Sequence, residues 1–228
     1  MKYIIIGLGN FGSSLAVKLT NMGHEVIGVD KYMGKVEAMK ELVTHTVCLD
    51  STDPQAVTNL PLKDADIVIV GIGEDEGANI MVTALMKHLK VKRIISRAIS
   101  PLHQTVLEAM GVDEIVHPEE ETAARFAKML NIQGIINSFE LGGEYNIVEA
   151  TVPAKYEGKT LEEAAIGRNY NIVVLTTIKI LNEKNLLGVA KKVRQVQEVA
   201  SSRTKLEAGD RLVLYGNLQD IQRLLKED

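Results

Sequence analysis

Short apolar runs rich in valine and isoleucine recur along the first half of the chain, and segments with helical periodicity separate them. Continuous apolar runs are typical of strands that are buried on both faces, and strands that alternate with helices form parallel sheets through right-handed crossovers. We therefore predict an α/β fold with a Rossmann-like, doubly wound parallel sheet. The six predicted strands are residues 3–6, 25–29, 46–49, 67–70, 93–96 and 114–116.

The pattern changes after Gly134, where we place a domain boundary. Gly142 and Gly143 suit a tight turn between two strands, and the sequence TLEE at 160–163 matches a helix capping box. Leucine and isoleucine then recur at helical spacing over 218–225. Residues 135–228 therefore predict a second, smaller α+β domain, with strands over 139–141, 145–152, 172–180 and 211–215.

Composition limits the classes of protein to which these domains can belong. The formal net charge of −4 and the lack of a basic tract argue against nucleic-acid binding. Cys48 is the only cysteine, so no internal disulfide forms, which suits a reducing cytoplasm. No apolar segment approaches the roughly 20 residues that span a bilayer. We expect a cytoplasmic protein that does not insert directly into the membrane and reaches one only through a partner.

The segment 3–30 combines a predicted strand, a G-x-G-x-x-G motif, a helical pattern and a second strand that ends in an acid. Gly7 suits the tight turn after the strand, Gly9 lets the backbone approach a pyrophosphate, and Gly12 allows close packing of helix on sheet. Asp30 is placed to accept hydrogen bonds from both ribose hydroxyls of an adenosine. The segment predicts a site for a dinucleotide or adenine nucleotide; the alternative is a glycine-rich turn without a ligand.

Five segments together resemble the cytoplasmic regulatory subunits of bacterial Ktr/Trk potassium-uptake systems. They are GLGNFG with Asp30, LDSTD at 49–53, GIGEDEGAN at 71–79, VDEIVHPEE at 112–120 and LEAGDRLVLYG at 206–216. The resemblance implies a nucleotide-binding RCK (regulator of potassium conductance) N-terminal domain over 1–134 and an RCK C-terminal domain over 135–228. It also implies a homo-oligomer, whether dimer, tetramer or octameric ring, docked on a membrane potassium-channel subunit at the inner face of the cell membrane. Such subunits change conformation with bound ATP/ADP or NAD(H).

The resemblance extends the candidate ligand site to other residues that follow predicted strands, at the edge where open α/β sheets bind ligands. Ser51 and Thr52 match the position that holds adenine in the family, although a helix-capping role around Asp53 is equally compatible with their sequence. Arg97 is placed to reach a phosphate or to form a surface ion pair. The candidate binding residues are Gly7, Gly9, Asn10, Phe11, Gly12, Asp30, Lys31, Asp50, Ser51, Thr52, Gly71, Ile72, Gly73 and Arg97.

Two candidate residues bear on which ligand binds. Asn10 stands where many ATP-responsive relatives carry an arginine, and an amide cannot bind phosphate as a guanidinium does. This departure favours NAD(H) and weakens the expectation of a preference for ATP over ADP. Glu119 matches a carboxylate that helps to hold a divalent cation in some relatives; the alternative is an acid that offsets a helix dipole in its first turn.

Two classes of function follow from these patterns. The first is a non-enzymatic, nucleotide-sensing subunit that gates a potassium channel or transporter. The alternative is a small NAD-dependent oxidoreductase, which needs a proton-transfer residue beside the nicotinamide. Of the five histidines, only His117 follows a predicted strand at the ligand-binding edge. The sequence therefore favours the regulatory subunit.

Overall fold

A computed structural model describes residues 1–184 and 190–226 of the chain. Contacts divide the chain into two compact units, Met1–Glu120 and Glu121–Asp228, which are described separately below. The sequence placed the boundary at Gly134, at the end of helix α6 (Pro118–Asn131) rather than near its start. The difference arises because Met129 and Ile132 pack in the hydrophobic core of the second unit.

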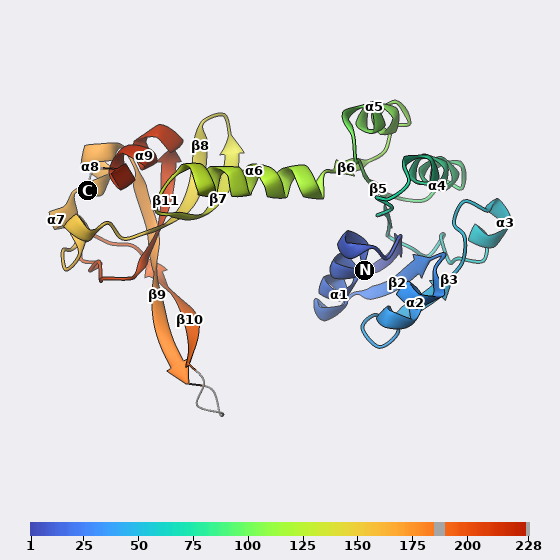
Figure 1. Cartoon of the computed structure of the whole chain (residues 1–228), viewed down its shortest axis with the longest axis horizontal. Helices are drawn as coiled ribbons and strands as arrows, with labels where there is room; N and C mark the ends of the chain where they lie inside the picture. Colours follow the sequence, from blue (N-terminus) through green and yellow to red (C-terminus); the bar gives the residue numbers. More distant parts are fainter. Residues whose placement is uncertain (185–189, 227–228) are drawn as a thin grey trace. The chain divides into compact units, whose positions relative to one another are not determined.

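The first unit contains a six-stranded parallel sheet in the order β3-β2-β1-β4-β5-β6. Its elements run from blue to green in Figure 1. This topology confirms the predicted doubly wound fold, because the strand order reverses between β1 and β4. The strands are β1 (Lys2–Ile6), β2 (Glu25–Asp30), β3 (His45–Cys48), β4 (Ile67–Val70), β5 (Ile94–Arg97) and β6 (Glu114–Val116). The helices that follow them are α1 (Asn10–Asn21), α2 (Met33–Met39), α3 (Pro54–Val57), α4 (Glu76–His88), α5 (Pro101–Ala109) and α6.

Side chains of the central strand β1 pack into two hydrophobic clusters. Ile4 and Ile6 belong to one cluster, together with Met86 of α4. Ile5 belongs to the other, together with Ala16 of α1. Successive side chains of a strand point to opposite faces, so a strand covered by helices on both faces has to be apolar at every position. This requirement explains why the first strands were evident in the sequence.

The second unit contains a five-stranded antiparallel sheet in the order β10-β9-β11-β8-β7. A tight turn connects β7 to β8 as predicted, but it lies one residue later than expected: Gly142 ends β7 and pairs with Tyr145, and Gly143, with φ +59°, and Glu144 form the turn. The predicted capping box is also present, since the side chains and backbones of Thr160 and Glu163 bond reciprocally. The strands are β7 (Ile135–Gly142), β8 (Tyr145–Thr151), β9 (Val173–Lys184), β10 (Ala190–Val199) and β11 (Arg211–Asn217). The helices are the 3-10 turn η1 (Ala154–Tyr156), α7 (Leu161–Ala164), α8 (Ile166–Tyr170) and α9 (Leu218–Lys226).

Strand β10 was not predicted. It lies at an edge of the sheet, where it pairs only with β9, and its sequence contains the polar run KKVRQVQE. An edge strand with little apolar surface to bury carries no continuous hydrophobic run. Across residues 1–184 and 190–226, none of the helices combines the length and the apolar character needed to cross a bilayer.

Candidate functional site

A cavity of about 430 Å³ lies at the carboxyl ends of the parallel strands of the first unit. Its volume falls in the range of about 300–1,000 Å³ that is usual for small-molecule sites. Every residue that the sequence proposed for the site lines this cavity except Gly12. The structure thus brings together residues at or just after the carboxyl ends of five strands, β1 to β5, as the parallel topology requires.

The three glycines of the motif meet different steric demands. Gly7 has φ +97°, and a Cβ there would lie 2.9 Å from the backbone nitrogen of Ile72. A Cβ on Gly12 would lie 1.9 Å from the carbonyl oxygen of Gly7, so α1 packs directly on the turn. Gly9 is different, because a Cβ there would have no atom within 4 Å. Gly7 and Gly12 are therefore required by the fold, whereas the space at Gly9 opens into the cavity.

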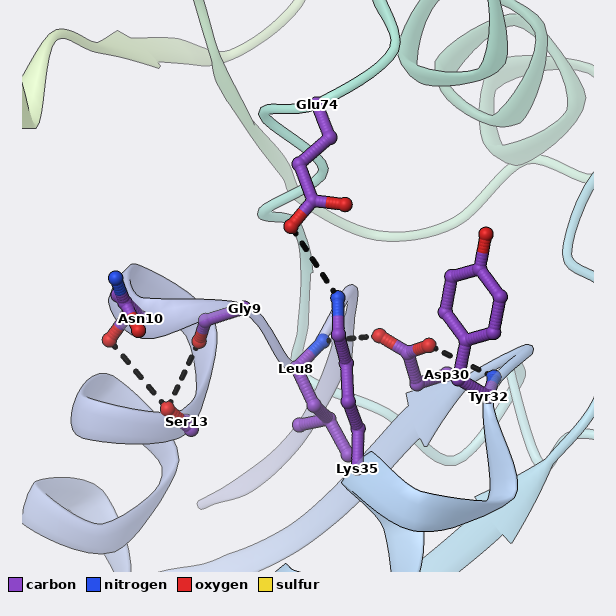
Figure 2. A network of polar contacts seen from close by, with 8 residues as sticks. All are labelled: Leu8, Gly9, Asn10, Ser13, Asp30, Tyr32, Lys35 and Glu74. Atoms are coloured by element: carbon purple, nitrogen blue, oxygen red, sulfur yellow. Dashed lines mark hydrogen bonds and ion pairs between the residues drawn. The ribbon is translucent and has the colours of Figure 1, made fainter.

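Helix α1 presents an uncapped N-terminus at this cavity. Gly9 is the N-cap residue and has no side chain to bond the first turn, which also contains no acidic residue. The hydroxyl of Ser13 instead donates to the carbonyl oxygens of Gly9 (2.8 Å) and Asn10 (3.4 Å), as Figure 2 shows. The N–H groups of the first turn and the positive end of the helix dipole are left for an anion.

The carboxylate of Asp30 is held in place at the end of β2. Its side chain is buried, with the residue only 7% exposed. One oxygen accepts a hydrogen bond from the backbone N–H of Leu8 (2.8 Å), and the other accepts one from the N–H of Tyr32 (2.9 Å), both drawn in Figure 2. A carboxylate oxygen has more than one acceptor position. Asp30 therefore retains acceptors for ribose hydroxyls while its orientation is set by the backbone.

An ion pair that the sequence analysis did not find spans the cavity lining. Lys35 of α2 and Glu74, which follows Gly73, approach to 3.4 Å between Nζ and Oε1. Figure 2 shows the long lysine side chain rising past Asp30 toward Glu74. The ammonium groups of Lys31 and Lys35 each lie 5.3 Å from the centre of the Tyr32 ring. The only signal available in the sequence was proximity, since Glu74 directly follows Gly73 and Lys35 lies four residues after Lys31.

The residues after β3 form a closed turn. One oxygen of Asp50 accepts hydrogen bonds from the N–H (2.9 Å) and the hydroxyl (2.7 Å) of Thr52. Both bonds lower the pKa of Asp50 below its ordinary value, and the bond from the Thr52 hydroxyl has the larger effect. Asp53 caps α3 by accepting a hydrogen bond from the N–H of Gln55. The helix cap at the centre of that alternative is therefore present at Asp53, while Ser51 and Thr52 line the cavity and their contact with adenine stays a prediction.

Arg97 contributes a guanidinium to the site from the end of β5, in addition to the ammonium groups of Lys31 and Lys35. Its side chain is 14% exposed and is ion-paired to Glu119. The guanidinium lies 5.8 Å from the centre of the Phe11 ring. A Cβ on Gly73 would lie 2.3 Å from Nη1 of Arg97, so a side chain there would displace the guanidinium from this position. An ion pair was one of the two roles expected for Arg97. The structure contains this pair, with Glu119, and both residues line the cavity.

A buried polar cluster centred on Asn79 bonds the backbone of the segments that carry Ile72 and Arg97. The sequence analysis did not identify this cluster. Asn79 of α4 is fully buried, and its amide donates to the carbonyl oxygens of Ile72 (2.9 Å) and Arg97 (3.1 Å). Its own oxygen contacts the Ser96 hydroxyl (3.0 Å) and Nε2 of His103 (3.2 Å). Burial lowers the pKa of His103 below its ordinary value of 6.5. In the sequence, Asn79 is the last residue of the segment GIGEDEGAN, and no pattern around it indicates that its side chain is buried.

The described residues of this chain do not build a metal site. Within residues 1–184 and 190–226, no group of three or more His, Cys, Asp or Glu side chains is arranged to hold a metal ion. Glu119 is paired with the guanidinium of Arg97 rather than with other carboxylates. The side chains in the described part of one chain therefore do not supply a donor set for a divalent cation.

Comparison with known proteins gives one family match and several relatives. A sequence profile for the TrkA-N domain matches residues 3–118. Ktr system potassium uptake protein A of Bacillus subtilis (strain 168) is 31% identical, over 99% of this chain and 96% of that protein. Ktr system potassium uptake protein C of the same organism is 32% identical over the same shares.

Solved structures show the same fold. The RCK domain of GsuK superposes with a TM-score of 0.66 at 18% identity, over 99% of this chain, which spans about half (48%) of the GsuK chain. The NAD(P)-binding domain of an exopolyphosphatase-related protein from Archaeoglobus fulgidus superposes with a TM-score of 0.51 at 26% identity. That match covers 57% of this chain and 96% of the other.

Proposed function

Because the chain belongs to the TrkA-N family of Ktr/Trk-type regulatory subunits, we propose that it gates a membrane potassium-uptake protein according to the adenine nucleotide in its cavity. The observation that carries this proposal is the joint placement of Asp30, Gly9 and Arg97 around one cavity. A carboxylate for ribose, an open helix N-terminus for phosphate and a cation are the groups that a nucleotide requires. The B. subtilis relatives, named as potassium uptake proteins over nearly the whole chain, support the regulatory role.

The proposal assigns an adenosine part and a phosphate part to the cavity. Asp30 and the turn at Asp50–Thr52 hold the adenosine, and the α1 N-terminus holds the phosphates. Asp30 disfavours a 2′-phosphate, because two negative groups would meet at the ribose. Asn10 provides no guanidinium for a terminal phosphate, so the site suits NAD(H) or ADP at least as well as ATP. The NAD(P)-binding domain from A. fulgidus supports a dinucleotide as one ligand of this fold.

Gating requires that the ligand bind one conformation of an assembly better than another. We propose a closed homo-oligomer, a dimer, a tetramer or an octameric ring, attached to the inner face of the membrane through a potassium-channel subunit. Apolar side chains on the sheet of the second unit support an assembly, since Phe139, Val173 and Val199 are 64%, 53% and 86% exposed. A divalent cation is compatible with this proposal only if another subunit supplies further ligands.

The decisive experiment is a binding and stability test on the purified full chain. ATP, ADP, NAD and NADH are titrated by calorimetry, and thermal unfolding is followed with each ligand. A ligand at 100 times its dissociation constant stabilises the folded state by about 2.7 kcal/mol. We expect at least one of the four to do so, and light scattering to find an oligomer. The absence of binding by all four ligands refutes the proposal.

The alternative of an NAD-dependent oxidoreductase is tested on the same protein. Among the residues that line the cavity in the described part of the chain, none is a histidine. His117 lines a neighbouring cavity of about 320 Å³ instead. We therefore expect no cofactor reduction with common hydroxy acids and aldehydes. Turnover with any of them overturns the assignment as a non-enzymatic subunit.

A further inference from the structure

The ion pair between Arg97 and Glu119 lies where two cavities meet. Arg97 ends β5, and Glu119 is the second residue of α6. Both residues, together with Gly73, line the cavity of about 430 Å³ and the neighbouring cavity of about 320 Å³. The two partners differ in exposure, because the side chain of Arg97 is 14% exposed and that of Glu119 is 65% exposed. The arginine is therefore built into the site, and the glutamate reaches it from the surface.

Neighbouring residues position the guanidinium of Arg97, and not all of its N–H donors are used. The ring of Phe11 lies beside it, Gly73 leaves room for it, and Asn79 anchors the backbone of Arg97 from behind. Its Nε is buried and has no hydrogen-bond partner among the described residues. A guanidinium carries five N–H donors in a planar fork. Arg97 thus has the capacity to bind an anion that enters beside Phe11.

Phe11 places such an anion at the N-terminus of α1. It follows Asn10 in the first turn of that helix, which is uncapped. A phosphate bound there and the carboxylate of Glu119 would therefore compete for the same guanidinium. A largely buried arginine is costly without a negative partner, so the empty site needs an anion of its own. Glu119 provides it.

We propose that Glu119 is an internal competitor of ligand phosphate for Arg97. The proposal rests on the nucleotide site proposed above and adds how that site is controlled. In the empty site the Glu119 carboxylate pairs with Arg97; a bound phosphate takes its place, and Glu119 turns to solvent. The competition sets a threshold concentration of phosphate-bearing ligand, and it changes the contacts of the first turn of α6 when the cavity fills.

A competitor role and a metal-binding role for Glu119 predict opposite changes in ligand affinity when its carboxylate is removed. A carboxylate that competes with phosphate weakens ligand binding, so its removal strengthens binding. A carboxylate that holds a cation beside the phosphates strengthens binding, so its removal weakens binding whenever the cation is present. Measurements with EDTA and with Mg²⁺ therefore separate the two roles.

The experiment compares Glu119→Gln with Glu120→Gln in the full chain. Glu120 is the matched control, because it is the next residue of α6, is exposed and carries the same charge. ADP and adenosine are titrated by calorimetry in EDTA, and thermal unfolding confirms that each variant is folded. We expect Glu119→Gln to bind ADP about two- to fivefold more tightly, the upper part of the range for a partly exposed charge pair. Adenosine, which has no phosphate, and the Glu120→Gln variant should each show a change below about twofold.

A double-variant cycle shows whether the effect passes through the guanidinium. In an Arg97→Gln background, Glu119→Gln should no longer strengthen ADP binding, because the shared partner is gone. An equal gain in that background shows a long-range charge effect and overturns the proposal. Unchanged or weaker ADP binding by Glu119→Gln in EDTA also overturns it, while ADP binding by the unaltered protein leaves the nucleotide site standing. If neither the unaltered protein nor Glu119→Gln binds any ligand, both proposals fall.

Discussion

Replacement of Gly9 by valine should remove nucleotide binding and leave the fold intact. The backbone at Gly9 has φ −70° and ψ −172°, an extended conformation that any residue adopts. A Cβ there meets no atom within 4 Å, so the side chain extends into free space in the cavity. The stability cost is limited to a poorer N-cap, about 1 kcal/mol. The pyrophosphate, in contrast, loses its approach to the backbone.

The size of the binding loss follows from the contacts that valine would block. Hydrogen bonds to a charged group contribute about 1.5–3 kcal/mol each. Loss of two of them weakens the binding of ATP, ADP and NAD by at least about a hundredfold, equivalent to about 2.7 kcal/mol. Calorimetric titration measures this loss, and urea unfolding measures the stability of the same preparation.

Gly12→Ala is the matched control at the other end of the motif. Its Cβ would lie 1.9 Å from the Gly7 carbonyl oxygen, whereas real Cβ contacts under 3.0 Å are essentially absent, so α1 or the turn must move. We expect this variant to lose about 1–3 kcal/mol or more of stability, as overpacked sites do. The assignment of Gly9 to the phosphate site is refuted if folded Gly9→Val binds all three ligands as well as the unaltered protein does.

Three further predictions concern individual side chains of the site. Asp30→Ala should weaken ATP, ADP and NAD by a similar amount, about 1.5–3 kcal/mol; loss for a single ligand in calorimetry would contradict a contact with the shared ribose. The unaltered protein should bind ATP and ADP within about tenfold of each other, and Asn10→Arg should increase the preference for ATP; a larger preference before the change would contradict this role of Asn10. Burial, opposed weakly by Glu76, lowers the pKa of His103 from 6.5, so the unfolded state binds more protons and stability should fall as the pH drops below 6.5. His103→Gln should flatten this fall in urea unfolding at pH 5–7, and an unchanged pH profile would show that His103 is not its source.

The sequence alone was sufficient to predict the doubly wound sheet and the glycine-rich turn at its centre. Strands buried on both faces carry a local signal, because every position has to be apolar. Parallel strands also place their carboxyl ends at one edge, so the location of residues after each strand follows from the topology. For this reason Asp30, Thr52 and Gly73 could be assigned to one site although they are far apart in the chain. Their contacts with a nucleotide stay a prediction.

Other features depend on how separate segments pack, and no local pattern reveals them. Asn79 resembles any polar residue near a helix start, and only the burial of α4 against β4 and β5 makes it a hydrogen-bonding centre. Strand β10 was hidden because an edge strand needs no continuous apolar run. Helix α6 was assigned to the first domain because its sequence follows β6 without a break, whereas side chains at its end pack in the second core.

The Arg97–Glu119 pair shows most clearly what tertiary structure decided. The sequence showed each residue at the binding edge and left each with two roles, because a charge has no periodicity that identifies its partner. The ends of β5 and β6 lie side by side in the sheet, which brings the start of α6 within reach of the guanidinium. Local hydrophobic pattern therefore determined the scaffold and the edge at which ligands bind. Only the packing of that scaffold determined which charges meet there, because Coulomb interactions depend on distance in space and not on separation along the chain.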